Sequence, residues 1–185
     1  MENKLSIIQG ITYSLKKLLP VHCLRTIFFA LAYPHIVQNI IIWGGAPTTS
    51  IRPIAIKMNK ILRNILNVRF DAARRPIVPT NNMYKALNIL KLEDIYEFQL
   101  LKFIVTSQQS DDGIWTKYFS NLRPIHNYST RRTGLNIPNI RTNVERASAL
   151  FQCVRAYNSL PATFNIENMD AFKIQYKFSC LSEYW

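Results

Sequence analysis

One long apolar run constrains the fold of this chain more than any other segment. It extends from Leu24 to Gly45 and reads LRTIFFALAYPHIVQNIIIWGG. Such a run is compatible with a membrane span, a buried helix or two shorter elements. A span needs about 20 mostly apolar residues, yet Arg25 lies near one end of the run and Gln38 and Asn39 fall inside it. Because polar groups are costly in lipid, we expect a helix that neighbouring elements bury on nearly all sides.

Two features of the run predict where this helix bends and where it stops. Pro34 lacks a backbone N–H and disfavours the helical conformation of the preceding Tyr33, so a kink or break is expected there. The run then closes with Trp43-Gly44-Gly45. Since glycine readily adopts the left-handed conformation that terminates helices, this exit predicts the end of the element.

The rest of the sequence predicts a mainly α protein. Hydrophobic residues make up 48% of the 185 residues, which supports a packed core, and only five glycines are present. We expect a basic helical bundle over residues 1–75 and a smaller unit of helices and loops over residues 76–185. Further helices are expected at 4–19, 51–69, from Thr80 onward, at 92–106, 114–122, 141–158 and 169–185, with a long loop at 123–140.

The helix expected at 51–69 is strongly amphipathic. Ser50 is its expected N-cap, and Pro53 falls in its expected first turn. At about 100° per residue, one face is an apolar stripe of Ile51, Ile54, Ala55, Met58, Ile61, Leu62, Ile65 and Leu66. The opposite face carries Arg52, Lys57, Lys60 and Arg63.

Other helices carry simpler expectations. In the first helix, the residues expected to share the apolar side are Leu5, Ile8, Ile11, Leu15 and Leu18 or Leu19. Thr80 is expected to cap the helix that it begins. The last helix is expected to pack three aromatic residues, Phe172, Tyr176 and Phe178.

Charge is the strongest functional signal in the sequence. The formal net charge is +12. Residues 1–75 hold 11 Lys and Arg against 2 Asp and Glu, a net +9, whereas residues 76–185 hold 12 against 9, a net +3. Such an excess suits a polyanion, either nucleic acid or an anionic membrane surface. We therefore expect the surface that faces this partner to lie mostly in the first unit.

Two sets of residues are candidates for nucleic-acid contact. Basic side chains give affinity by contacting phosphates, and those of the first unit are Lys16, Lys17, Arg52, Lys57, Lys60, Arg63, Arg69, Arg74 and Arg75. The second set mixes aromatic and cationic groups within the expected loop and comprises His126, Tyr128, Arg131 and Arg132. A solvated helix face and a surface loop pinned by Tyr128 are the alternative interpretations.

Signals for catalysis or metal binding are weak. Asp111-Asp112 is the only pair of adjacent aspartates, and its flanks are typical of a turn or helix cap rather than a metal site. No phosphate-binding loop, dinucleotide-binding glycine motif, nucleophile elbow or zinc-protease motif is present. We predict no catalytic residue, metal site, cofactor or small-molecule substrate in this chain.

The cysteines and the N-terminus bear on the compartment. Cys23, Cys153 and Cys180 are isolated in the sequence and predict neither a disulfide framework nor a zinc site. The N-terminus lacks the pattern of a secretory leader. We therefore expect an intracellular protein, in the nucleus or the cytoplasm.

Several short motifs occur in the order found in one known family. In the first unit they are Leu24-Arg25-Thr26-Ile27-Phe28, Tyr33-Pro34, Ile42-Trp43-Gly44 and Lys60-Ile61-Leu62-Arg63. In the second they are Pro79-Thr80, Leu87-Asn88-Ile89-Leu90, the spaced His126, Tyr128, Thr130 and Arg131, and Asn158-Ser159-Leu160-Pro161. Together they resemble the region after the polymerase palm in non-LTR retrotransposon reverse transcriptases of the jockey-like kind, from about Leu5 to Tyr184. One departure is Tyr157, where the family usually has Trp.

This resemblance implies a thumb-like bundle at 1–75 that holds template and primer, followed by the C-terminal segment of the family at 76–185. The implied partners are an RNA template, an RNA/DNA duplex and the polymerase palm. The palm, with its catalytic carboxylates and divalent metal, and the endonuclease are both absent from this sequence, so the chain alone is expected to be inactive as an RNA-directed DNA polymerase. One alternative is a helical protein-interaction module with partly exposed Trp115, Tyr118, Phe119 and Tyr157. Another is peripheral membrane attachment through the helix at 51–69.

Overall fold

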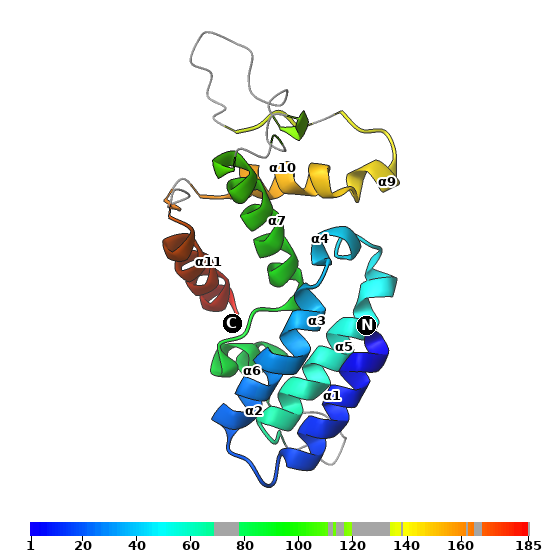
Figure 1. Ribbon diagram of the computed structural model, residues 1–185, viewed down its shortest axis with the longest axis vertical. Helices are drawn as coiled ribbons and strands as arrows, with labels where there is room; N and C mark the ends of the chain where they lie inside the picture. Colours follow the sequence, from blue (N-terminus) through cyan, green and yellow to red (C-terminus); the bar gives the residue numbers. More distant parts are fainter. Residues whose placement is uncertain are drawn as a thin grey trace. The chain divides into compact units, whose positions relative to one another are not determined.

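The computed structural model describes residues 1–68, 78–110, 113, 117–119, 134–137, 139–161, 163–164 and 168–184 (Figure 1). Every regular element within these ranges is a helix, which confirms the prediction of a mainly α protein. The elements are α1 (Glu2–Leu15), α2 (Val21–Ile27), the π-helix η1 (Phe28–Ala32), α3 (Tyr33–Val37), α4 (Ile40–Trp43), α5 (Thr48–Ile65), α6 (Thr80–Leu87), α7 (Leu92–Gln109), α9 (Asn143–Arg146), α10 (Ala149–Ser159) and α11 (Met169–Glu183).

The long apolar run is helical, but it is not buried on all sides as predicted. Its buried side chains fall at every fourth position and are Leu24, Phe28, Ala32, Ile36 and Ile40. Leu31 and Ile42, by contrast, are 42% and 79% exposed. A row with this spacing drifts around an α-helix of 3.6 residues per turn. The wider π-turn of η1 offsets part of that drift, so the row keeps facing the core.

The disturbance expected at Pro34 is a π-turn that comes just before it. The N–H of Tyr33 bonds to the carbonyl of Phe28, five residues back, and Tyr33 keeps a helical backbone with φ −59° and ψ −44°. The helix is interrupted later, after Gln38, where Asn39 has a φ of +55°. The break is thus made by an asparagine in the left-handed conformation rather than by the proline.

The glycines after Trp43 act differently from the prediction. Gly44 and Gly45 do not have a positive φ, and Gly113 is the one described glycine that does. A Cβ added at Gly45 would lie 2.5 Å from the carbonyl oxygen of Ala147 and 3.0 Å from the hydroxyl of Tyr96. Gly45 is therefore required by the close approach of another backbone segment.

Two other helices end at asparagines. Asn67, with a φ of +48°, follows the end of α5 and stops the helix before residue 69, the predicted end. Asn88 is the C-cap of α6 and has φ 54° and ψ 48°. Asparagine is the residue after glycine that tolerates this conformation best, so it can replace glycine at a helix C-terminus.

The predicted N-caps of α5 and α6 are wrong. Each helix begins directly after a proline, Pro47 for α5 and Pro79 for α6, and neither has a side-chain cap. Ser50 lies inside the first turn of α5 rather than at its cap, and Pro53 is correspondingly deeper in the helix than predicted. A proline with extended ψ already directs the chain into the helix, so the side-chain cap is dispensable.

The described chain folds into two compact units. Unit 1 comprises Met1–Ile40, Ala46–Ile95 and Lys177–Trp185, and unit 2 comprises Ile41–Gly45 and Tyr96–Tyr176. The boundary predicted near residue 75 lies outside the described residues. The observed division differs from it because α6, the start of α7 and the end of α11 belong to the first unit.

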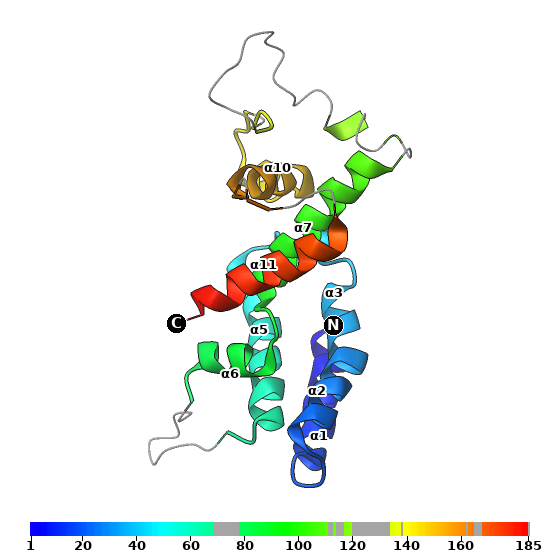
Figure 2. The ribbon, with the colours of Figure 1, turned by 90° about the vertical axis from the view of Figure 1, so that its left-hand side faces the viewer.

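Unit 1 is a bundle in which α1 and α5 run in the same direction and the α2–η1–α3 rod runs in the opposite one (Figures 1 and 2). The centre of the apolar stripe predicted for α5 is confirmed, since Met58, Ile61, Leu62 and Ile65 are at most 1% exposed. These side chains form the core of unit 1 together with the buried row of the long apolar run.

The core face of α1 differs by one position from the prediction. Leu5 and Ile8 are buried, but Ile11 is 37% exposed and Thr12 is fully buried. The Thr12 hydroxyl donates to the carbonyl of Gln9 at 3.0 Å and accepts from the side-chain amide of Asn64 at 3.2 Å. A buried hydroxyl is tolerated there because Asn64 on α5 supplies its partner.

Arg25 joins α2 to the end of α6 within unit 1. Its Nε donates to the carbonyl of Leu87 at 2.6 Å, and its guanidinium lies 4.9 Å from the centre of the Phe29 ring. Leu87 is the last residue of α6, where carbonyls lack helical partners, so a cation is favourable there. Burial, and then the charge of Arg25, lower the pKa of the half-buried Lys177.

Tyr184 forms a second link in unit 1. Its hydroxyl donates to the carboxylate of Asp94 and accepts from the backbone N–H of Lys91 at 2.9 Å. Its ring packs edge-on against Tyr84, whose own hydroxyl donates to Asn59 on α5 at 2.6 Å. Burial raises the pKa of both tyrosines.

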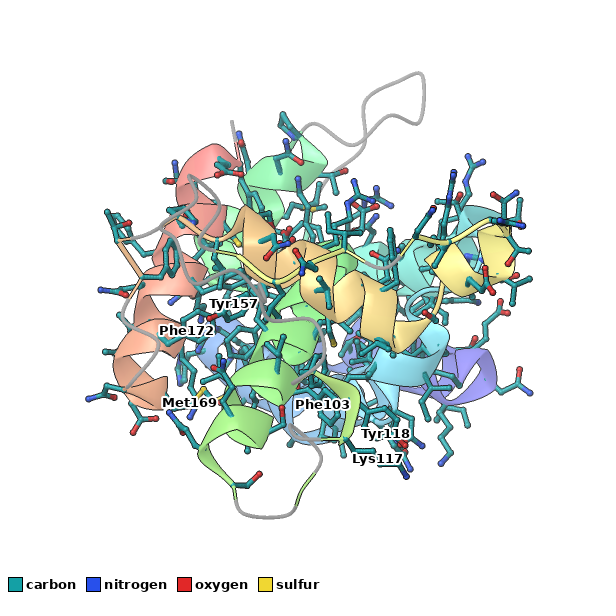
Figure 3. All side chains as sticks on the ribbon, turned by 90° about the horizontal axis from the view of Figure 1, so that it is seen from above. Phe103, Lys117, Tyr118, Tyr157, Met169 and Phe172 are labelled. Atoms are coloured by element: carbon teal, nitrogen blue, oxygen red, sulfur yellow. The ribbon has the colours of Figure 1, made fainter. Side chains whose placement is uncertain are left out.

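Unit 2 is built around α7 and α10. Its buried cluster consists of Leu100, Ile104, Val105, Phe119, Leu135, Cys153 and Val154. Figure 3 labels Phe103, Tyr157 and Met169, which pack against this cluster. The first part of α11 joins the unit through Phe172, stacked on Phe98 of α7 at 6.1 Å. Phe172 and Tyr176 are buried as predicted, but Phe178 is 77% exposed, so its predicted packing is wrong.

A side-chain amide holds the segment before α9 in unit 2. Asn158 accepts from the N–H of Leu135 at 2.8 Å and donates to the carbonyl of Leu135 at 2.7 Å. A Cβ added at Gly134 would lie 2.4 Å from the Asn158 oxygen, so glycine is needed beside the amide. We call this pair of hydrogen bonds the Asn158 clamp.

Candidate nucleic-acid interface

The candidate interface is the outward side of α5. Arg52 and Lys60 are exposed and Lys57 and Arg63 are half-buried, on the side away from the buried Met58, Ile61, Leu62 and Ile65. Arg52 and Lys60 are two turns apart, or about 12 Å along an α-helix. Successive phosphates of one strand are about 3.4 Å apart along a duplex axis, so the row spans roughly three to four of them. We call these four residues the basic row.

The basic row has no internal counter-charge in the described chain. None of its four side chains forms an ion pair there, where the one ion pair joins Lys173 to Asp170 on α11. An uncompensated row of cations lowers the free energy of a nearby polyanion and makes its binding dependent on salt.

Arg63 is less available than the other three. Its Nε is buried and has no hydrogen-bond partner among the described residues. Its charge opposes the pKa rise that burial imposes on Tyr84 of α6. The sequence places Arg63 on the basic face, but the structure turns its side chain partly toward α6, which leaves Arg52, Lys57 and Lys60 as the freer contacts.

The structure places Lys16 and Lys17 just after α1. The Lys16 ammonium lies 4.3 Å from the centre of the Tyr13 ring, whereas Lys17 is exposed. Because α1 and α5 run in the same direction and Thr12 bonds to Asn64, these lysines follow toward the C-terminal end of α5.

The remaining predicted contacts lie outside the described residues. These are Arg69, Arg74 and Arg75, together with the second set, His126, Tyr128, Arg131 and Arg132. The aspartate pair Asp111-Asp112 and Trp115 also lie outside them.

Two arginines that the sequence did not single out meet in unit 2. Arg146, on α9, and Arg155, on α10, line one hollow of about 460 Å³. Their separation of nine residues carries no signal in a chain with 23 Lys and Arg, so only the fold reveals the pair.

The described residues provide neither a metal site nor a membrane span. No group of three His, Cys, Asp or Glu side chains among the described residues could hold a metal ion. No helix in the described ranges is both long and apolar enough to cross a bilayer. The apolar side of α5, the alternative membrane contact, is buried at Met58, Ile61 and Leu62, whereas Ile51 and Ile54 near its start are half-buried.

Comparison with known proteins adds no family. No family model matches the sequence, and comparisons with curated proteins and with solved structures each found no match. The functional interpretation therefore rests on the residues, their resemblance to one family and the geometry described above.

Proposed function

We propose that this chain binds nucleic acid through the basic row of α5, as the thumb and C-terminal part of a non-LTR retrotransposon reverse transcriptase. The observation that carries the proposal is a helix buried on its apolar side with Arg52, Lys57 and Lys60 outward and without ion-pair partners in the described chain. An RNA template and an RNA/DNA duplex are the proposed partners, since the row contacts phosphates without reading bases.

In this role the chain contributes binding and not chemistry. No catalytic residue is assigned to it, and polymerisation would require the palm, the third proposed partner. Lys16 and Lys17 would extend the contact surface beyond the C-terminal end of α5.

The test is a salt titration of binding to a short RNA/DNA hybrid, measured by fluorescence anisotropy. With three phosphate contacts, the logarithm of the association constant should fall with the logarithm of salt concentration with a slope of roughly −3. The variant Arg52→Gln/Lys60→Gln should weaken binding and reduce the slope by roughly 1 for each phosphate that is no longer neutralised. Both side chains are exposed, so the fold should tolerate the change.

The matched control is Lys85→Gln/Lys102→Gln. It removes the same charge from two other exposed positions, on α6 and α7. A control variant that loses as much affinity as Arg52→Gln/Lys60→Gln would contradict the basic row as the binding surface. Binding that does not vary with salt would contradict the proposal as a whole.

The protein-interaction alternative receives mixed support. It requires exposed aromatic residues in the second unit, and Tyr118 is 48% exposed. However, Phe119 is 1% exposed and Tyr157 packs against the buried cluster of unit 2. Tyr118 and the partly exposed Tyr157 thus meet the requirement of this alternative, whereas the buried Phe119 does not.

A further inference from the structure

The hollow of unit 2 combines two kinds of wall. One side comes from the segment after the Asn158 clamp and includes Ile137 and Ile140. The other comes from α9 and α10 and includes Arg146, Phe151, Gln152 and Arg155. Its volume of about 460 Å³ falls in the range of small-ligand sites.

The charge in the hollow is positive and uncompensated. Arg146 and Arg155 are both exposed, and neither forms an ion pair with a described carboxylate. The neighbouring Glu145 does not line the hollow, and its carboxylate accepts the N–H groups of Arg141 and Thr142 at 3.3 Å each. Two guanidinium groups at one hollow are suited to a phosphate, which they can bind through paired hydrogen bonds.

The remaining walls are suited to a base. Phe151 is half-buried at the first turn of α10, and Ile137 and Ile140 add apolar surface to the same hollow. Gln152 donates its amide to the carbonyl of Arg146 at 2.7 Å, which fixes the side chain and leaves its oxygen as an acceptor. An inorganic phosphate would use the arginines alone, whereas a nucleotide also uses the ring and the amide.

We infer that this hollow binds an unpaired nucleotide of a single-stranded RNA or DNA, with its phosphate at Arg146 and Arg155 and its base against Phe151. A duplex does not fit the same chemistry, because its bases are stacked and its backbone requires an open row such as that on α5. The inference rests on the proposed function for the source of the nucleotide, and it gives unit 2 a different binding role from that of unit 1.

The test compares three ligands on the full chain: a single-stranded oligonucleotide, the RNA/DNA hybrid and free AMP. The variant Arg146→Gln/Arg155→Gln should weaken single-strand binding at least about tenfold, since each charged contact contributes substantially. Phe151→Leu, which keeps an apolar side chain, should weaken it roughly 5- to 150-fold through loss of stacking. Both variants should leave hybrid binding within about twofold of the unaltered protein.

The control is Lys102→Gln/Lys117→Gln, which removes two exposed charges of unit 2 away from the hollow. Protection of the buried Cys153 from a thiol reagent reports that each variant keeps unit 2 folded. Equal single-strand affinity in the arginine variant and this control would overturn the inference. AMP binding as tightly as the oligonucleotide would also overturn it, because the occupant would then be a free nucleotide.

The two pairs of variants distinguish a failure of the inference about the hollow from a failure of the proposed function. Hybrid binding that falls more than single-strand binding in Arg52→Gln/Lys60→Gln supports two distinct binding surfaces. If the α5 variant changes neither affinity while the arginine variant abolishes single-strand binding, the result contradicts the basic row as a binding surface and supports nucleotide binding in the hollow. If the α5 variant weakens binding while the arginine variant changes neither affinity, the result contradicts nucleotide binding in the hollow and still supports the proposed function.

Discussion

Each of the two units is held together by a pair of side-chain hydrogen bonds, and the side chains that form these bonds differ in chemistry. In unit 1 the buried hydroxyl of Tyr184 joins the carboxylate of Asp94 and the backbone of Lys91. In unit 2 the Asn158 clamp uses a neutral amide to hold both backbone groups of Leu135. The first link is an ionisable donor within an aromatic cluster, whereas the second has no group that titrates. The comparison teaches that pH and side-chain truncation should act unequally on the two units.

The largest expected effect is that of Tyr184→Ala. This change removes a ring that is 4% exposed, its packing against Tyr84 and both hydrogen bonds, so the free energy of unfolding should fall by about 3–5 kcal/mol. Tyr184→Phe removes only the hydroxyl and should cost about 1.5–3 kcal/mol. Urea denaturation followed by circular dichroism measures both values.

The control for this change is Tyr13→Ala. Tyr13 is also an aromatic residue of unit 1, but it is 62% exposed, so its loss should change stability by less than about 0.5 kcal/mol. If Tyr184→Ala cost no more than this control, the Tyr184 link would have no role in holding unit 1 together.

A smaller loss is expected for Asn158→Ala. The variant loses both hydrogen bonds of the Asn158 clamp, which are partly exposed to solvent, and should cost about 1–2 kcal/mol in the same assay. Asn158→Asp keeps the acceptor for the Leu135 N–H but places a carboxylate against the Leu135 carbonyl, so it should not restore stability. The exposed Asn143→Ala provides the comparison, and an equal cost there would argue against the clamp.

The pH dependence sharpens the difference between the links. The pKa of an unfolded tyrosine is about 10, and burial raises the pKa of Tyr84 and Tyr184 above that value. The unfolded chain therefore loses tyrosine protons that the folded chain retains, so the contribution of these two tyrosines to stability is complete below pH 10 and falls as pH rises above it. Tyr184→Phe should flatten this fall, whereas Asn158→Ala should lower stability equally at each pH. Parallel profiles for wild type and Tyr184→Phe would refute this assignment.

The smallest expected effect is a difference in thiol reactivity between the two units. Cys153 is fully buried in unit 2, and burial raises the pKa of its thiol to about 12, whereas Cys23 and Cys180 are half-buried in unit 1. A thiol reagent at neutral pH should modify Cys23 and Cys180 first and Cys153 only after opening of unit 2. Asn158→Ala should increase the rate at which Cys153 is labelled, whereas Tyr184→Phe should not. The variant Cys153→Ser shows which labelling phase belongs to Cys153, because that phase should disappear.

The sequence predicts best where a single period governs a whole element. The apolar stripe and basic face of α5 are set by local spacing, and its Met58, Ile61 and Leu62 lie in the core as predicted. The stop of α5 at Asn67 and the burial of Thr12 were not predicted. Thr12 is buried because Asn64, 52 residues away, bonds to it, and a local pattern cannot contain that information.

The candidate sites show the same limit. Helical spacing places Arg63 on the basic face, but its Nε is buried and its charge acts on Tyr84 of another helix. The hollow depends on Arg146 and Arg155 meeting a loop segment held by Asn158. Interactions between residues distant in sequence decide both features, so periodicity identifies the surface but not the availability of each side chain.

The π-turn η1 has a consequence for how this chain tolerates changes in length. The buried residues Leu24, Phe28, Ala32, Ile36 and Ile40 recur every four positions. Without the exposed Ala30 the same side chains would recur at intervals of four, three, four and four, which is the spacing of an ordinary α-helix. The turn thus accommodates one surplus residue, and deletion of Ala30 should convert η1 to α-helix while the core keeps its register.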